Sequence, residues 1–82
     1  LGTWGSLQNL LEKDHNNNTK NNESTYFFNS NNCLVKVESD KMVLIDGLEG
    51  YIVIDTKDRL MILSAENEQE LKTYLKKINK AQ

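Results

Sequence analysis

The stretch GLEGYIVIDTKDRLMIL, residues 47–63, decides the fold. It holds two apolar runs, Tyr51–Ile54 and Leu60–Leu63, separated by residues 56–58, whose types favour a turn. Neither run alternates with polar residues, which indicates strands that are covered on both faces. A sheet closed on itself, with a further element packed outside it, would provide that cover.

Three further β-type runs precede this stretch, and each is followed by turn-forming residues. Together with the two above they are spaced roughly nine residues apart, which is typical of an all-β unit with tight corners. The expected strands are Thr25–Phe28, Cys33–Val37, Met42–Asp46, Tyr51–Asp55 and Leu60–Leu63.

The C-terminal region predicts an amphipathic helix over Glu66–Lys80. Its apolar residues Leu71, Tyr74, Leu75 and Ile78 fall at helical spacing, while acids crowd its start and lysines follow. We expect this stripe to form the lid of the strands.

The N-terminal region predicts a second helix from Thr3 to about Asp14. Trp4, Leu7, Leu10 and Leu11 recur there at helical spacing. Because the chain opens at Leu1 without a methionine, we interpret residues 1–15 as a helix leading out of a preceding domain.

Residues 16–24 are rich in asparagine and hold no apolar residue that could enter a core. Such a segment is typical of a solvated loop or linker, and it predicts a boundary between two units. The domain proper is then expected over residues 25–82, including the terminal helix.

Length and charge exclude several classes of protein. A chain of 82 residues forms one domain at most and buries only about 60% of its unfolded surface, so we expect it to associate. Its 12 acidic and 10 basic residues give a net charge of −2, which opposes nucleic acid and anionic membranes as partners. A single cysteine, Cys33, excludes an internal disulfide and favours a cytoplasmic location.

Residues capable of catalysis are few. His15 is the only histidine and lies beside asparagines, without a neighbouring nucleophile. Cys33 begins a predicted strand, where a small buried hydrophobe is expected. An independent small enzyme would have to use Asp46, Asp55 or Asp58, but aspartate is also a routine turn residue, and no metal site is predicted from Asp55 and Asp58.

Several short motifs, taken in order, resemble one family. LGTWGSL at residues 1–7, NCLV at 32–35 and GLEGYIVIDTKD at 47–58 are followed by RLMIL at 59–63 and QELK at 69–72. This order and spacing resembles the C-terminal end of mannose-1-phosphate guanylyltransferases, over nearly the whole chain.

The resemblance implies a parent enzyme that condenses GTP with mannose 1-phosphate and releases pyrophosphate and GDP-mannose, with magnesium as its cofactor. In that family an N-terminal nucleotide-binding α/β domain carries the chemistry. Its glycine-rich loop has no match in these 82 residues. The resemblance therefore implies that this chain holds no catalytic residue, no metal site and no cofactor of its own.

The family's C-terminal part is a short left-handed β-helix that helps subunits associate. The resemblance thus implies a mainly β, β-helix-like unit of about five short strands, with an N-terminal and a C-terminal helix. Gly2, Thr3 and Trp4 correspond to the rim of the family's sugar site. The implied partners are the chain's own N-terminal catalytic domain and further copies of the protein.

Two other interpretations stay open. Five strands closed by an amphipathic helix also suit a free-standing pleckstrin-homology-like module that binds a peptide or a lipid head group. Alternatively, the parent could be a related nucleotidyltransferase that uses glucose 1-phosphate or another sugar.

Overall fold

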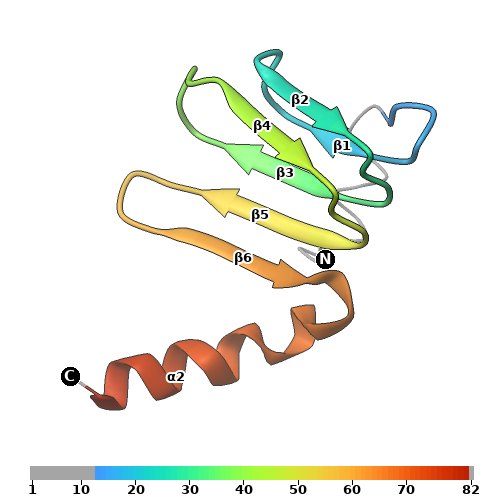
Figure 1. The fold of residues 1–82 in the computed structure, drawn as a ribbon. Helices are drawn as coiled ribbons and strands as arrows, with labels where there is room; N and C mark the ends of the chain where they lie inside the picture. Colours follow the sequence, from blue (N-terminus) through green and yellow to red (C-terminus); the bar gives the residue numbers. More distant parts are fainter. Residues whose placement is uncertain (1–12, 82) are drawn as a thin grey trace.

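The computed structural model describes residues 13–81 (Figure 1). Of the helix predicted for Thr3–Asp14, only Lys13 and Asp14 fall within this range. Neither is helical, because Lys13 pairs with Thr19 in an antiparallel bridge and Asp14 leads into a turn. The remainder of that prediction lies outside the described residues.

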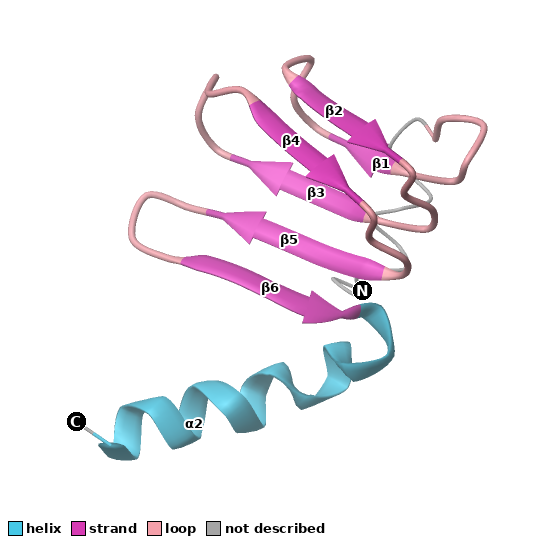
Figure 2. Cartoon of the chain, in the orientation of Figure 1, coloured by secondary structure: helices cyan, strands magenta, loops and turns pink. Residues whose placement is uncertain are grey.

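The described part of the chain is mostly β, with a single α-helix at its C-terminal end (Figure 2). All five predicted strands are confirmed, with bounds within one residue of those expected. A sixth strand precedes them. In chain order the elements are β1 (Thr19–Lys20), β2 (Thr25–Phe28), β3 (Leu34–Val37), β4 (Val43–Asp46), β5 (Tyr51–Asp55), β6 (Leu60–Ser64), the 3-10 helix η1 (Ala65–Glu70) and α2 (Leu71–Ala81).

The strands form two sheets instead of one closed sheet. One has the order β1-β3-β5-β6 and the other consists of β2 and β4. Alternate strands pair in parallel, and only β6 runs antiparallel to its neighbour β5. The chain therefore crosses from one sheet to the other and returns one strand further along. We call the stretch of chain between successive register partners in the larger sheet one coil. The coil from Thr19 to Leu34 is 15 residues long (34 − 19), and the coil from Leu34 to Ile52 is 18 residues long (52 − 34).

Apolar residues pack on both faces of the larger sheet. Between the two sheets, Val35, Val37 and Val53 meet Ile45 of β4. On the opposite face Leu34, Ile52 and Ile54 form a second cluster, with Met61, Leu63 and Ala65 packed against it. The prediction that β5 is covered on both faces is confirmed. The same prediction for β6 is wrong, because Leu60 and Ile62 are exposed.

Residues with a positive φ angle occupy corresponding corners of successive coils. Asn17, Asn32 and Gly50, with φ of 65°, 57° and 69°, each lie two residues before a strand position in the same register. Asn29 and Gly47, with φ of 52° and 75°, follow the paired ends of β2 and β4. Asparagine and glycine tolerate this region better than other residues, which accounts for their placement at these corners.

Residues 16–24, predicted to be a solvated loop, instead form part of the first coil of the stack. They contain β1, and Asn18 and Thr19 are buried. The Asn18 amide nitrogen donates to the Ser30 carbonyl at 2.8 Å, and its oxygen accepts from the Cys33 N–H at 3.0 Å. The prediction failed because hydrogen bonds take the place of an apolar core in this coil.

The C-terminal helix begins where Ser64 caps η1, its hydroxyl accepting from the Glu66 N–H at 3.3 Å. The predicted element is confirmed, although its first six residues are 3-10 helix. Its expected role as a lid is wrong: Figure 1 draws α2 beyond the β6 edge of the sheet, and Tyr74 and Ile78 are exposed.

Candidate interaction surface

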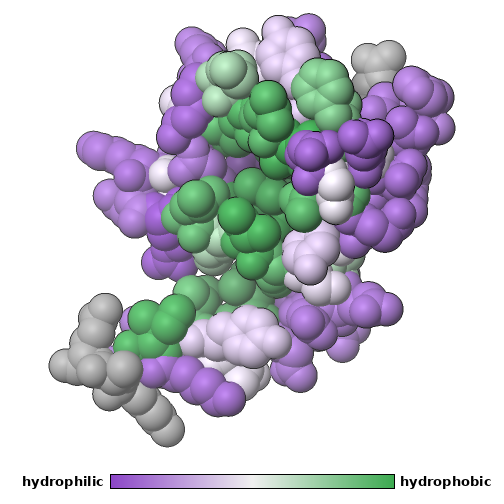
Figure 3. Space-filling model, in the orientation of Figure 1, coloured by the Kyte–Doolittle hydropathy of each residue, from purple (hydrophilic) through white to green (hydrophobic). Residues whose placement is uncertain are grey.

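Among the described residues, eight large apolar side chains are exposed. On the face drawn in Figure 3, apolar side chains lie over β2, β4, β6 and α2. Small monomers rarely expose large contiguous patches of this kind, so the surface is a candidate for contact with another protein. Its large apolar side chains are Tyr26, Phe28, Met42, Leu44, Leu60, Ile62, Tyr74 and Ile78.

The first half of this surface is the outer face of the two-stranded sheet. Tyr26 and Leu44 are register partners there, and 50% and 61% of their surfaces are exposed. Their chain neighbours Thr25 and Ile45 point the other way and are buried, as strand alternation requires. The Lys20 ammonium lies 5.9 Å from the centre of the Tyr26 ring, within cation–π range.

The second half, which we call the β6–α2 surface, consists of Leu60, Ile62, Tyr74 and Ile78. Ile62 is the register partner of Val53, yet Ile62 is 59% exposed and Val53 only 5%. The cause is the unequal width of the sheets: the smaller one has two strands, β2 and β4, and the larger one four, with β6 at its edge. An edge strand can also accept a further strand through its backbone.

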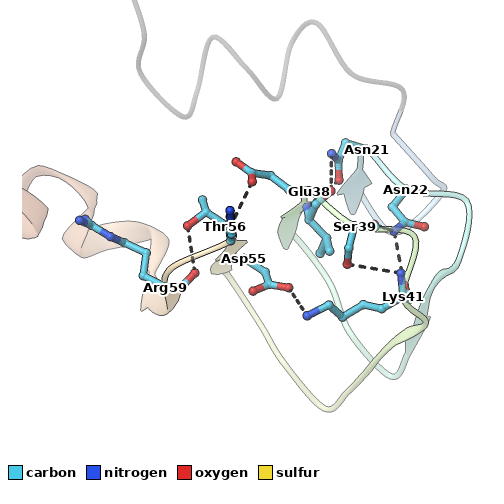
Figure 4. A network of polar contacts seen from close by, with 10 residues as sticks. Asn21, Asn22, Glu38, Ser39, Lys41, Asp55, Thr56 and Arg59 are labelled. Atoms are coloured by element: carbon cyan, nitrogen blue, oxygen red, sulfur yellow. Dashed lines mark hydrogen bonds and ion pairs between the residues drawn. The ribbon is translucent and has the colours of Figure 1, made fainter.

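A polar network joins the turns that follow β3 and β5 (Figure 4). Lys41 forms an ion pair with Asp55 at 2.7 Å, and the Lys57 N–H donates to the Glu38 carboxylate at 3.2 Å. These residues line a hollow of about 310 Å³. The network contains no paired nucleophile and base. Its contacts hold adjacent coils together.

A larger hollow of about 610 Å³ lies near the start of the described chain and is lined in part by Asp14. The Asp14 carboxylate accepts from the Asn16 and Asn18 N–H groups at 2.9 and 2.8 Å. Partial burial acts to raise the pKa of Asp14, but these hydrogen bonds and nearby His15 outweigh it and hold the pKa below its usual value. A carboxylate held in its charged form by the turn suits a structural role better than proton transfer.

Within the described part of the chain, the residues considered for catalysis or binding do not come together in one site, and His15, Asp46 and Asp58 are exposed. Gly2, Thr3 and Trp4 lie outside the described residues. Cys33 is buried, as predicted, and Asp55 is held by the ion pair. Among residues 13–81, no cluster of three or more histidine, cysteine, aspartate or glutamate side chains could hold a metal ion.

Sequence reasoning missed the asparagine contacts between coils. The Asn17 amide donates to the Asn32 side chain at 2.8 Å, and the Asn32 amide donates to Glu49 at 2.7 Å. The available signal was the recurrence of asparagine pairs, Asn16-Asn17 and Asn31-Asn32, at a separation of 15 residues.

Comparison with known proteins aligns nearly the whole chain with a small part of larger proteins. The alginate biosynthesis protein AlgA of Pseudomonas aeruginosa is 33% identical over 79 residues, which make up 96% of this chain and 16% of that protein. A mannose-1-phosphate guanylyltransferase of Klebsiella pneumoniae is 28% identical over 72 residues, covering 88% of this chain and 15% of the relative. No family model matches.

One solved structure has the same fold. It is described as mannose-1-phosphate geranyltransferase from Thermus thermophilus, and it matches 95% of this chain and 23% of its own with a TM-score of 0.70. At 18% sequence identity the likeness concerns the fold alone.

The fold defines a domain of stacked strands, which corresponds to a minor part of much larger proteins. In sequence the chain is similar to the C-terminal part of AlgA and of mannose-1-phosphate guanylyltransferases, which confirms the resemblance predicted above. The chain spans only 15–16% of the length of these relatives. Within its described residues, no helix is long and apolar enough to cross a membrane.

Proposed function

We propose that this chain is the C-terminal structural part of a mannose-1-phosphate guanylyltransferase and is itself catalytically silent. The observation that carries this proposal is the alignment of 96% of the chain with 16% of AlgA. The contacts of Lys41 with Asp55 and of Lys57 with Glu38 support it, since they join adjacent coils.

The parent enzyme would condense GTP with mannose 1-phosphate, releasing pyrophosphate and GDP-mannose, with magnesium as its cofactor. The described residues do not fit a magnesium site, because their carboxylates do not gather in a group that could ligate a cation. We therefore assign the nucleotide, the sugar phosphate and the metal to the part of the parent outside this chain. Gly2, Thr3 and Trp4 are proposed at the rim of its sugar site.

We also propose that the coils form a short left-handed β-helix. The parallel stacking of alternate strands supports this, as does the 18-residue separation of the partners Thr25 and Val43, which equals three hexapeptides. An experimental structure determines the hand directly, and a right-handed coil would contradict the proposal.

In this proposal the domain packs on its own catalytic part and holds copies of a cytoplasmic enzyme together. The exposed surface described above supports such contacts. The pleckstrin-homology-like module is not favoured by the comparisons, which align the chain with guanylyltransferases.

The experiment that tests the proposal has two arms. The 82-residue chain is assayed for pyrophosphate release from GTP and mannose 1-phosphate with magnesium, and we expect none. In the second arm this chain replaces the matching C-terminal part of Pseudomonas aeruginosa AlgA, with a deletion of that part as control.

We expect the chimera to keep guanylyltransferase activity and the deletion to lose stability or activity. Pyrophosphate release by the chain alone would overturn catalytic silence. A folded, inactive chimera would contradict the structural assignment.

A further inference from the structure

The α2 helix carries an apolar stripe that is only partly covered. Leu71, Tyr74, Leu75 and Ile78 lie at i, i+3, i+4 and i+7, which places them on one side of the helix. Leu71 and Leu75 are half-buried, whereas Tyr74 and Ile78 are 41% and 53% exposed. In Figure 3 the apolar surface of α2 continues onto that of β6.

We propose that this β6–α2 surface binds the same surface of a second copy of the chain, with the two α2 helices antiparallel. The inference rests on the structural role proposed above and adds the contact surface and its geometry. A two-fold dimer requires a surface that is complementary to itself.

Charge order along the helix provides that complementarity. Glu66 and Glu70 lie in η1, before the stripe, while Lys72, Lys76 and Lys77 accompany it in α2. An antiparallel pair brings the acidic start of each helix toward the lysines of the other and also opposes the two helix dipoles. A parallel pair would place lysines beside lysines.

One reciprocal ion pair follows from the spacing. Leu71 and Ile78 are seven residues apart and therefore occupy equivalent core positions of a heptad. Glu70 and Lys77 each precede one of them by one residue, so both occupy the same flanking position in successive heptads. Antiparallel helices bring like flanking positions together, so Glu70 of each copy would face Lys77 of the other. Both residues are exposed, and neither forms an ion pair with another described residue.

The β6 strand is needed to complete this contact. From Leu71 to Ile78 the stripe rises only about 10 Å, at roughly 1.5 Å per residue. A stable interface buries on the order of 800 Å² per partner, which two turns of helix cannot supply alone. Leu60 and Ile62, 62% and 59% exposed, extend the apolar area beside the helix.

The test is the mass of the 82-residue chain in solution, measured by sedimentation equilibrium between about 1 μM and 1 mM. We expect a concentration-dependent dimer. Ile78→Glu should raise its dissociation constant roughly a hundredfold or more, since a charge replaces an apolar anchor. Leu44→Glu is the matched control, because Leu44 is at least as exposed (61% against 53% for Ile78) but lies on the smaller sheet, and it should leave dimerisation unchanged.

Charge reversal tests the antiparallel geometry without touching the apolar stripe. Glu70→Lys and Lys77→Glu should each weaken the dimer about tenfold. Each variant converts both of the ion pairs between the two copies into pairs of like charges. The double variant restores both pairs and should recover most of the affinity. Circular dichroism checks that each variant folds.

Three outcomes would overturn the proposal: a monomer throughout the concentration range, a dimer broken by Leu44→Glu but not by Ile78→Glu, or a double variant no tighter than the single ones. None of these measurements depends on activity. An active AlgA chimera alongside a monomeric chain would therefore contradict this interface while leaving the proposed function intact.

Discussion

Asn21 binds the backbone of Val37 twice. Its side-chain oxygen accepts from the Val37 N–H at 2.8 Å, and its side-chain nitrogen donates to the Val37 carbonyl at 3.0 Å. The amide thus takes the place of a peptide group that a longer β1 would supply, since β1 ends at Lys20. The first coil is tied to the second by a side chain where the backbone ladder stops.

Replacing Asn21 with alanine should destabilise the fold by about 1–3 kcal/mol, because it leaves the Val37 N–H and carbonyl without their partner. Urea denaturation measures the free energy of unfolding. Asn67→Ala, at an exposed position in η1, is the control and should change it by less than about 0.5 kcal/mol. Equal effects of the two substitutions would show that the Asn21 contacts contribute nothing.

Gly50 tests the corner conformation. It has φ of +69°, and a Cβ added there would meet no heavy atom within 4 Å. Gly50→Ala should therefore cost about 1–2 kcal/mol from backbone conformation alone. Gly50→Asn should cost less, because asparagine tolerates this region and occupies the equivalent corner positions 17 and 32. Thermal denaturation of both variants checks the order, and a less stable asparagine variant would refute it.

Asp14 should make stability depend on pH. Hydrogen bonds in the folded chain hold its pKa below the usual value of 3.8. A carboxylate whose pKa is lower in the folded chain than in the unfolded chain stabilises the fold at pH values above its unfolded pKa. That contribution is lost as the pH falls through its folded pKa. Asp14→Asn should therefore destabilise the chain at pH 7, with the difference from wild type shrinking below about pH 4 and vanishing below the folded pKa.

Denaturation curves recorded at several pH values measure that difference. Asp58→Asn is the control for removal of an exposed carboxylate. A gap between Asp14→Asn and wild type that stays constant down to about pH 2 would count against this origin.

Val53 and Ile62 are register partners with opposite environments. Val53→Ala should cost about 1.5–3 kcal/mol of unfolding free energy, because it removes buried apolar surface between the two sheets. Ile62→Ala should leave the stability of the monomer nearly unchanged but weaken self-association. Denaturation at low micromolar concentration, combined with sedimentation, separates the two effects; a large loss of monomer stability on Ile62→Ala would mean that Ile62 is covered within one chain.

Much of the fold was predictable because its signals are local. Turn residues separate the apolar runs, so the strands from Thr25 onward were placed within one residue. The first coil was missed because its interior is polar: Asn18 and Thr19 are buried without any apolar pattern to mark them. The two-sided cover of β6 was wrongly predicted because apolar content does not reveal whether a strand lies opposite.

For the candidate site, the sequence indicated a need for partners but not their place. Tyr74 and Ile78 have the same helical spacing in the sequence as residues that face a core. They are exposed because α2 lies beyond β6. The proposed rim residues Gly2, Thr3 and Trp4 remain a prediction from resemblance.

By itself, the sequence determined the order of strands and turns, the C-terminal helix and the likeness to guanylyltransferases, because each depends on neighbouring residues or on matching motifs. Only the tertiary structure decided the parallel pairing of alternate strands, the asparagine bridges between coils and the exposed β6–α2 surface. The pairing and the bridges depend on which residues 15 to 18 positions apart meet in space, and the exposed surface depends on β6 lying at the edge of the wider sheet. Asn21 and Val37 are joined only once one coil lies on the next.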